Sequence, residues 1–62
     1  MKDNKKTAII ARVNAAGSVT YLNKFNRFDP AFNVAKRHPA AWAAAYVERR
    51  GGAAAGFYVY EV

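Results

Sequence analysis

The stretch that decides the fold is residues 7–22, which reads TAIIARVNAAGSVTYL. Residues 7–13 and 18–24 are rich in the apolar and β-branched side chains that are typical of strands. Between them, residues 14–17 have the composition of a tight turn, in which Gly17 is free to take a positive φ. Because so short a connection joins neighbouring antiparallel strands, the sequence predicts a β-hairpin.

The middle of the chain predicts two helical segments. Asp29 and Pro30 are residue types that favour a helix start, so a short turn of helix is expected over residues 31–36. The main helix is expected over residues 39–50, because alanine is the strongest helix former and two glycines follow. Residues 57–62 then alternate in the manner of a third strand.

The order strand, strand, helix, strand predicts an α+β domain over residues 7–62. The expected architecture is a small three-stranded antiparallel sheet (ββαβ, order 2-1-3) with the first strand central and the main helix packed on one face. Residues 1–6 are expected to form a flexible basic tail. The second face of the sheet is expected to stay uncovered, and this predicts a homodimer.

Length and composition narrow the class of protein. With 62 residues and 53% hydrophobic side chains, the chain is suited to one small globular domain. It contains no cysteine, so disulfides and thiolate metal sites are excluded, and this suits a reducing cytosol. No targeting or membrane-spanning segment is apparent, so a cytoplasmic location is expected.

Residues for catalysis or metal binding are few. His38 is the sole histidine and Ser18 the sole serine, and the four acidic residues are scattered along the chain. A nucleophile needs a base and an orienting group, and a metal site needs three or four ligands together. The sequence therefore predicts no enzyme, no cofactor and no metal, and His38 is interpreted as a surface residue before the helix.

Trp42 and Tyr46 lie four residues apart and form one stripe on the main helix. The first interpretation is that this stripe packs on the sheet, in which case Trp42→Ala would cost about 3–5 kcal/mol. The alternative is an exposed binding anchor, a role in which Trp and Tyr are common.

Charge and aromatic residues together predict a binding surface. The formal net charge is +6, and basic domains are attracted to polyanions or to acidic protein surfaces. Tyrosines on strands could stack on bases while Lys and Arg hold phosphates, as in proteins that bind single strands. The candidate binding residues are Arg12, Tyr21, Lys24, Arg27, Lys36, Arg37, Arg49, Arg50, Tyr58 and Tyr60.

Three stretches carry a resemblance: TAIIARVNAAGSVTYL at residues 7–22, FDPAFNVAKRHPAAWAAAYV at residues 28–47 and GFYVYEV at residues 56–62. Together they resemble short phage- and prophage-encoded accessory proteins of the strand-strand-helix-strand type. That resemblance implies a stoichiometric inhibitor of host machinery, as anti-CRISPR proteins and polymerase inhibitors are. It also implies that the cytoplasm in which the protein acts is that of a bacterial host. Many such inhibitors are acidic DNA mimics, and the charge of +6 departs from that pattern.

Two functions are therefore expected. The first is a non-catalytic phage-type interaction protein that binds and inhibits or redirects a host protein or nucleoprotein complex. The alternative is a small nucleic-acid-binding domain that uses aromatic, Lys and Arg side chains on the sheet. The net charge favours the second, whereas an uncovered apolar sheet face and the lack of a known nucleic-acid motif favour the first.

Overall fold

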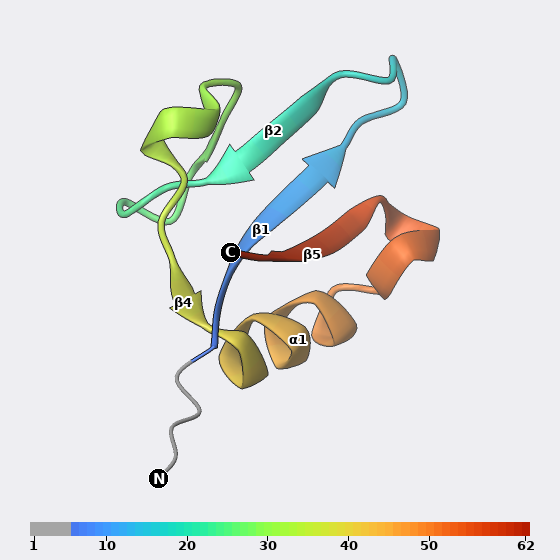
Figure 1. Cartoon of the computed structure of the whole chain (residues 1–62). Helices are drawn as coiled ribbons and strands as arrows, with labels where there is room; N and C mark the ends of the chain where they lie inside the picture. Colours follow the sequence, from blue (N-terminus) through green and yellow to red (C-terminus); the bar gives the residue numbers. More distant parts are fainter. Residues whose placement is uncertain (1–5) are drawn as a thin grey trace, which may run out of the picture.

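The computed structural model of the chain describes residues 6–62 and has one α-helix and five strands (Figure 1). Most of residues 1–6, predicted as a flexible tail, lie outside the described residues. The elements in chain order are β1 (Thr7–Val13), β2 (Val19–Leu22), β3 (Phe28–Asp29), the 3-10 turn η1 (Phe32–Val34), β4 (His38–Pro39), α1 (Ala40–Arg49), the 3-10 turn η2 (Gly52–Ala55) and β5 (Phe57–Glu61).

The sheet is antiparallel and centred on β1. One edge of β1 pairs with β5, from Ala8 opposite Glu61 to Arg12 opposite Phe57. The other edge pairs with β2 near its end and with β4 near its start, where Ala8 lies opposite His38. β3 adds to the outside of β2. The α+β class and the central first strand are confirmed.

The predicted number of three strands is wrong, because β3 and β4 also join the sheet. Each of these strands has only two residues. A segment so short has no period to detect in the sequence, and its pairing depends on how the chain returns to β1 and β2. The helix predicted over residues 31–36 is likewise only the three-residue turn η1.

The hairpin turn is built as the sequence predicts. The side-chain oxygen of Asn14 accepts hydrogen bonds from the backbone N–H groups of Ala16 and Ser18, at 2.9 and 3.0 Å. Gly17 has a φ of 87°, which a residue with a Cβ rarely adopts. The turn therefore fixes the register of β1 against β2.

The core lies between α1 and one face of the sheet. Ala43 and Val47 point from α1 onto Ala8 and Ile10 of β1 and Leu22 of β2. This corrects the prediction that the Trp42 stripe packs on the sheet, since Trp42 is 44% exposed. The two apolar stripes are only about 100° apart on a helix, and the small side chains let α1 approach the sheet closely.

Gly56 permits the close approach of η2 to the end of β1. Its φ is 89°, and a Cβ at this position would lie 2.4 Å from the backbone oxygen of Val13. The Val13 N–H also donates to the Gly56 carbonyl, at 2.8 Å. Any side chain here would force β5 away from β1.

The prediction that nothing in the chain covers the second face is also wrong in part. Ile9 is only 2% exposed and Ala11 is fully buried, although α1 lies on the other side. Ala11 lies opposite both Tyr21 and Tyr58, and η1 approaches the same face through Phe32, whose ring meets Tyr21 edge-on at 5.2 Å. The chain thus covers the centre of this face with its own aromatic rings.

Candidate anion-binding site

The turn between β2 and β3 holds one aromatic ring out toward solvent. The side-chain oxygen of Asn23 accepts hydrogen bonds from the N–H groups of Phe25 (2.8 Å) and Arg27 (3.1 Å). Asn26 completes the turn with a φ of 60°, a conformation that asparagine tolerates better than most residues. Phe25, at the tip, is 70% exposed.

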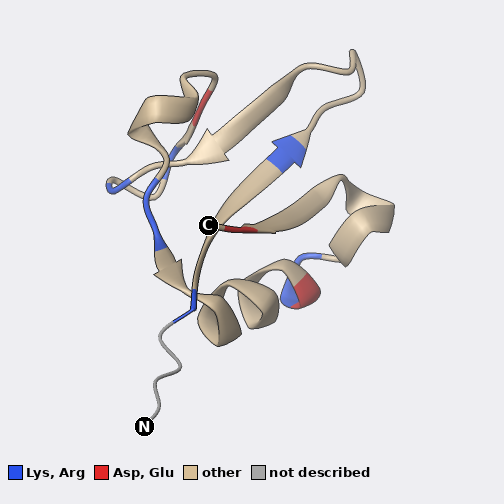
Figure 2. Cartoon of the chain, in the orientation of Figure 1, with Lys and Arg blue, Asp and Glu red and all other residues tan. Residues whose placement is uncertain are grey.

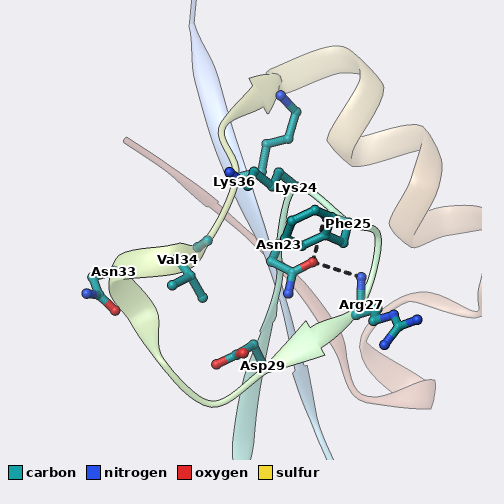
Figure 3. A pocket seen from close by; sticks show the side chains of 9 residues that line it. Asn23, Lys24, Phe25, Arg27, Asp29, Asn33, Val34 and Lys36 are labelled. Carbon is teal, nitrogen blue, oxygen red and sulfur yellow. Dashed lines mark hydrogen bonds between the residues drawn. The ribbon is translucent and has the colours of Figure 1, made fainter.

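The segment that leads from η1 to β4 returns beside this turn. Ala35 forms a bridge with Asn23, and the Lys36 N–H donates to the Leu22 carbonyl at 3.0 Å. Between the two segments lies an open hollow of about 680 Å³, here called the turn hollow (Figure 3). It is lined by Asn23, Lys24, Phe25, Arg27, Asp29, Asn33, Val34, Ala35 and Lys36.

Three of the predicted binding cations meet in the turn hollow: Lys24, Arg27 and Lys36. The ammonium of Lys24 lies 5.2 Å from the centre of the Phe25 ring. Asp29 is the single acid in the lining, and its carboxylate accepts the Ala31 N–H at 2.8 Å. In Figure 3 it lies away from Lys24 and Lys36, so the positive charges of the hollow are not neutralised by it.

The turn hollow belongs to a longer basic edge. Lys and Arg positions are found in the β2–β3 turn, in the segment into β4 and at the start of β1, which lie along one side of the ribbon in Figure 2. The Ala40 N–H donates to the Lys6 carbonyl, which places the start of β1 beside the end of β4. We call these three segments the basic edge, and their cations are Lys6, Lys24, Arg27, Lys36 and Arg37.

Arg49 and Arg50 lie elsewhere, at the end of α1. Here a ladder of stacked groups runs along the helix: His38 stacks on Trp42 at 4.2 Å between ring centres, and Trp42 meets Tyr46 at 5.4 Å. The Arg50 guanidinium lies 3.9 Å from the centre of the Tyr46 ring. We call these four residues the helix ladder. These stacking contacts stabilise the four side chains, and the Arg50 guanidinium already contacts the Tyr46 ring.

His38 is buried, which corrects its interpretation as a surface residue. Its pairing opposite Ala8 points it to the helix side of the sheet, where Trp42 covers it. Burial, and secondly the positive charge of Lys36, lower the pKa of His38 below 6.5. Its Nε2 has no hydrogen-bond partner among the described residues. The neutral imidazole acts here as part of the stack.

The remaining predicted residues are dispersed. Tyr58 and Tyr60 lie on the sheet face opposite α1 and are 39% and 49% exposed, and Tyr21 lies on the same face. Arg12 lies over the Phe57 ring at 5.7 Å and does not line the turn hollow. Arg37 lines a small separate hollow with Ile9 and Val62. The structure therefore divides the predicted surface into several parts.

Sequence reasoning missed Phe25 and the asparagines around it. The signal was present: residues 23–27 read NKFNR, an aromatic residue between two cations in a stretch with two turn-forming asparagines. Whether a phenylalanine in such a turn is exposed or packs against another segment depends on the tertiary structure. The aromatic residues predicted to stack on bases were tyrosines in the expected strands: Tyr21, Tyr58 and Tyr60.

Comparison with protein-family models, curated protein sequences and solved structures gives no significant match. Within residues 6–62, no helix has the length and hydropathy that crossing a membrane requires. In the same part of the chain, no three His, Asp or Glu side chains come together as a metal-binding group.

Proposed function

We propose that this chain is a non-catalytic nucleic-acid-binding protein that contacts the phosphate backbone with its basic edge. The observation that carries the proposal is that three adjoining segments, the β2–β3 turn, the segment into β4 and the start of β1, carry five of the eight Lys and Arg of residues 6–62. Neutralised phosphates release condensed counterions, so a line of cations is the feature that polyanion binding needs most.

The distribution of charge supports nucleic acid over simple solubility. Cations that served solubility alone would be interspersed with acids over the whole surface. Among residues 6–62, Asp29 is the single acid in the lining of the turn hollow, while Glu48 lies on α1 and Glu61 lies on β5, opposite Ala8. An exposed phenylalanine among the cations adds a surface on which a base can stack.

The test is a salt titration of binding to a labelled single strand of about 16 nucleotides, followed by fluorescence anisotropy. The logarithm of the association constant should fall linearly with that of salt concentration, by about 0.7 per phosphate contacted. The double variant Lys24→Ala/Lys36→Ala should lower this slope by about 1 to 2.

The matched control is Arg49→Ala/Arg50→Ala, which removes the same number of charges from the helix end. Its slope should stay close to that of the parent protein. An equal decrease of the salt slope in the two double variants would mean that net charge alone drives association. Affinity that is weak and insensitive to salt for both DNA and RNA would overturn the proposal.

A second candidate is the phage-type interaction protein that inhibits a host protein or nucleoprotein complex. It is favoured by the exposed aromatic and aliphatic side chains on the sheet face opposite α1: Val19, Phe32, Tyr58, Tyr60 and Val62. Exposed apolar groups in one area tend to mark protein interfaces. The same face could also join two copies of the chain as a homodimer.

Sedimentation equilibrium separates these uses of the face. A dimer mass at tens of micromolar that reverts to monomer in Tyr58→Asp/Tyr60→Asp supports the homodimer. A monomer mass in the parent protein would mean that the sheet face opposite α1 is free to bind a different protein. In that case the same variant should lose inhibition of the host complex while keeping its nucleic-acid affinity.

A further inference from the structure

We propose that the turn hollow binds one unpaired nucleotide of a single strand, with the base against Phe25 and the phosphate among Lys24, Arg27 and Lys36. This inference rests on the proposed function. It specifies that the bound nucleic acid is single-stranded and that one base stacks on Phe25. Phe25 is then the residue that makes binding depend on the base as well as on the phosphates.

The exposed ring of Phe25 is the first observation. A phenylalanine that is 70% exposed gains little from burial, yet two hydrogen bonds to the Asn23 side chain fix the turn that holds it there. Val34, 43% exposed, adds apolar surface to the same hollow. A flat ring held away from the core is suited to stack on a base, whichever base it is.

The position of the charges relative to the ring is the second observation. The Lys24 ammonium lies 5.2 Å from the centre of the Phe25 ring, and Arg27 and Lys36 line the same hollow. A phosphate held by Lys24 would therefore be next to a base stacked on Phe25, which is how base and phosphate are arranged within one nucleotide. Asp29 lies away from Lys24 and Lys36 in Figure 3, and its negative charge disfavours a second phosphate in that part of the hollow.

The size and polarity of the hollow agree with a nucleotide. Small-ligand sites commonly enclose about 300–1,000 Å³, and the turn hollow has about 680 Å³. Asn33 in its lining carries both a donor and an acceptor, which can pair with the edge of a base. Bases within a duplex are stacked on their neighbours and cannot enter the hollow, so the ligand is single-stranded.

The experiment measures anisotropy with the full chain and four labelled probes of equal length. These are a single DNA strand, the same sequence as RNA, its DNA duplex, and an abasic strand with the same phosphates but no bases. Single strands of DNA, RNA or both should bind more tightly than the abasic strand by roughly 5- to 150-fold, the range of one base stacked on an aromatic ring. The difference between DNA and RNA identifies the natural source of the nucleotide.

Phe25→Leu should bring the affinity for the single strand down to that for the abasic strand and leave the abasic affinity unchanged. Phe32→Leu is the control, since Phe32 is also an exposed phenylalanine, 59% exposed, but does not line the turn hollow. Equal binding of native, abasic and duplex probes, with no effect of Phe25→Leu, would overturn the nucleotide site while leaving the proposed function in place. Failure of all four probes to bind would overturn both.

Discussion

The turn hollow and the helix ladder both combine aromatic rings with cations, but they use them differently. In the helix ladder, His38, Trp42 and Tyr46 stack in series and the Arg50 guanidinium lies 3.9 Å from the last ring. In the turn hollow, Phe25 stands 70% exposed with Lys24 at 5.2 Å. In the first arrangement the rings and the guanidinium contact one another, whereas in the second the Phe25 ring is open to a ligand.

The difference follows from the backbone that carries each region. In α1, Trp42 and Tyr46 lie four residues apart on one stripe, so their rings meet. His38 in β4 and Arg50 just after α1 extend this stripe at its two ends. The β2–β3 turn is held by the Asn23 side chain, and within residues 6–62 no other ring pairs with Phe25 at its tip. Composition alone does not distinguish a stabilising cluster from a binding cluster.

The largest expected loss of stability is at Leu22, a core residue next to the turn hollow and outside the helix ladder. Leu22 is fully buried, and its carbonyl accepts the Lys36 N–H at the rim of the turn hollow. Leu22→Ala should lower the free energy of unfolding by about 2–5 kcal/mol, measured by urea denaturation. Amide exchange should show Lys36 losing protection. Val19→Ala, in the same strand but 37% exposed, is the control and should change stability far less.

Trp42→Ala interrupts the helix ladder at its centre. Because Trp42 is 44% exposed, the expected loss is about 1–2 kcal/mol, made up of two aromatic contacts and partial burial. Trp42→Phe should recover much of this, since a ring remains between His38 and Tyr46. A loss of about 3–5 kcal/mol in urea denaturation would mean that Trp42 is buried as the sequence first indicated.

The pH dependence of stability tests the buried end of the ladder. Burial, then Lys36, lower the pKa of His38 below 6.5, so the folded state binds fewer protons than the unfolded state. Stability contributed by the neutral imidazole should therefore be complete above pH 6.5 and decline as the pH falls through the folded pKa. Thermal melts of the parent should show this decline. His38→Phe should remove it, and an unchanged decline in that variant would contradict the assignment to His38.

The smallest expected effect on stability is that of Phe25→Ala. A surface substitution away from the core normally changes the free energy of unfolding by less than about 0.5 kcal/mol. Phe28→Ala is the contrast, because Phe28 packs against the core and meets Phe57 at 5.9 Å between ring centres. Similar losses in the two variants would show that Phe25 contributes to packing and is not held free for a ligand.

Part of the fold and of the site could be predicted from sequence. Three elements were predictable because each depends on neighbouring residues alone. The first and final strands follow from their apolar and alternating residues, and the hairpin turn follows from Asn14 and Gly17. Within the candidate site, Lys24, Arg27 and Lys36 were named individually. Their meeting in one hollow was not predictable, since Lys36 reaches the β2–β3 turn only through the bridge between Asn23 and Ala35.

The sequence by itself determined the class of this protein: an α+β domain with a β-hairpin, one main helix and a basic surface. These features depend on local conformational preferences and on composition, which each segment carries wherever it is placed. Tertiary structure alone decided which helix stripe is buried, that His38 lies under Trp42 and that Phe25 stays exposed beside three cations. Those outcomes depend on contacts between segments distant in the chain, and no local preference encodes such contacts.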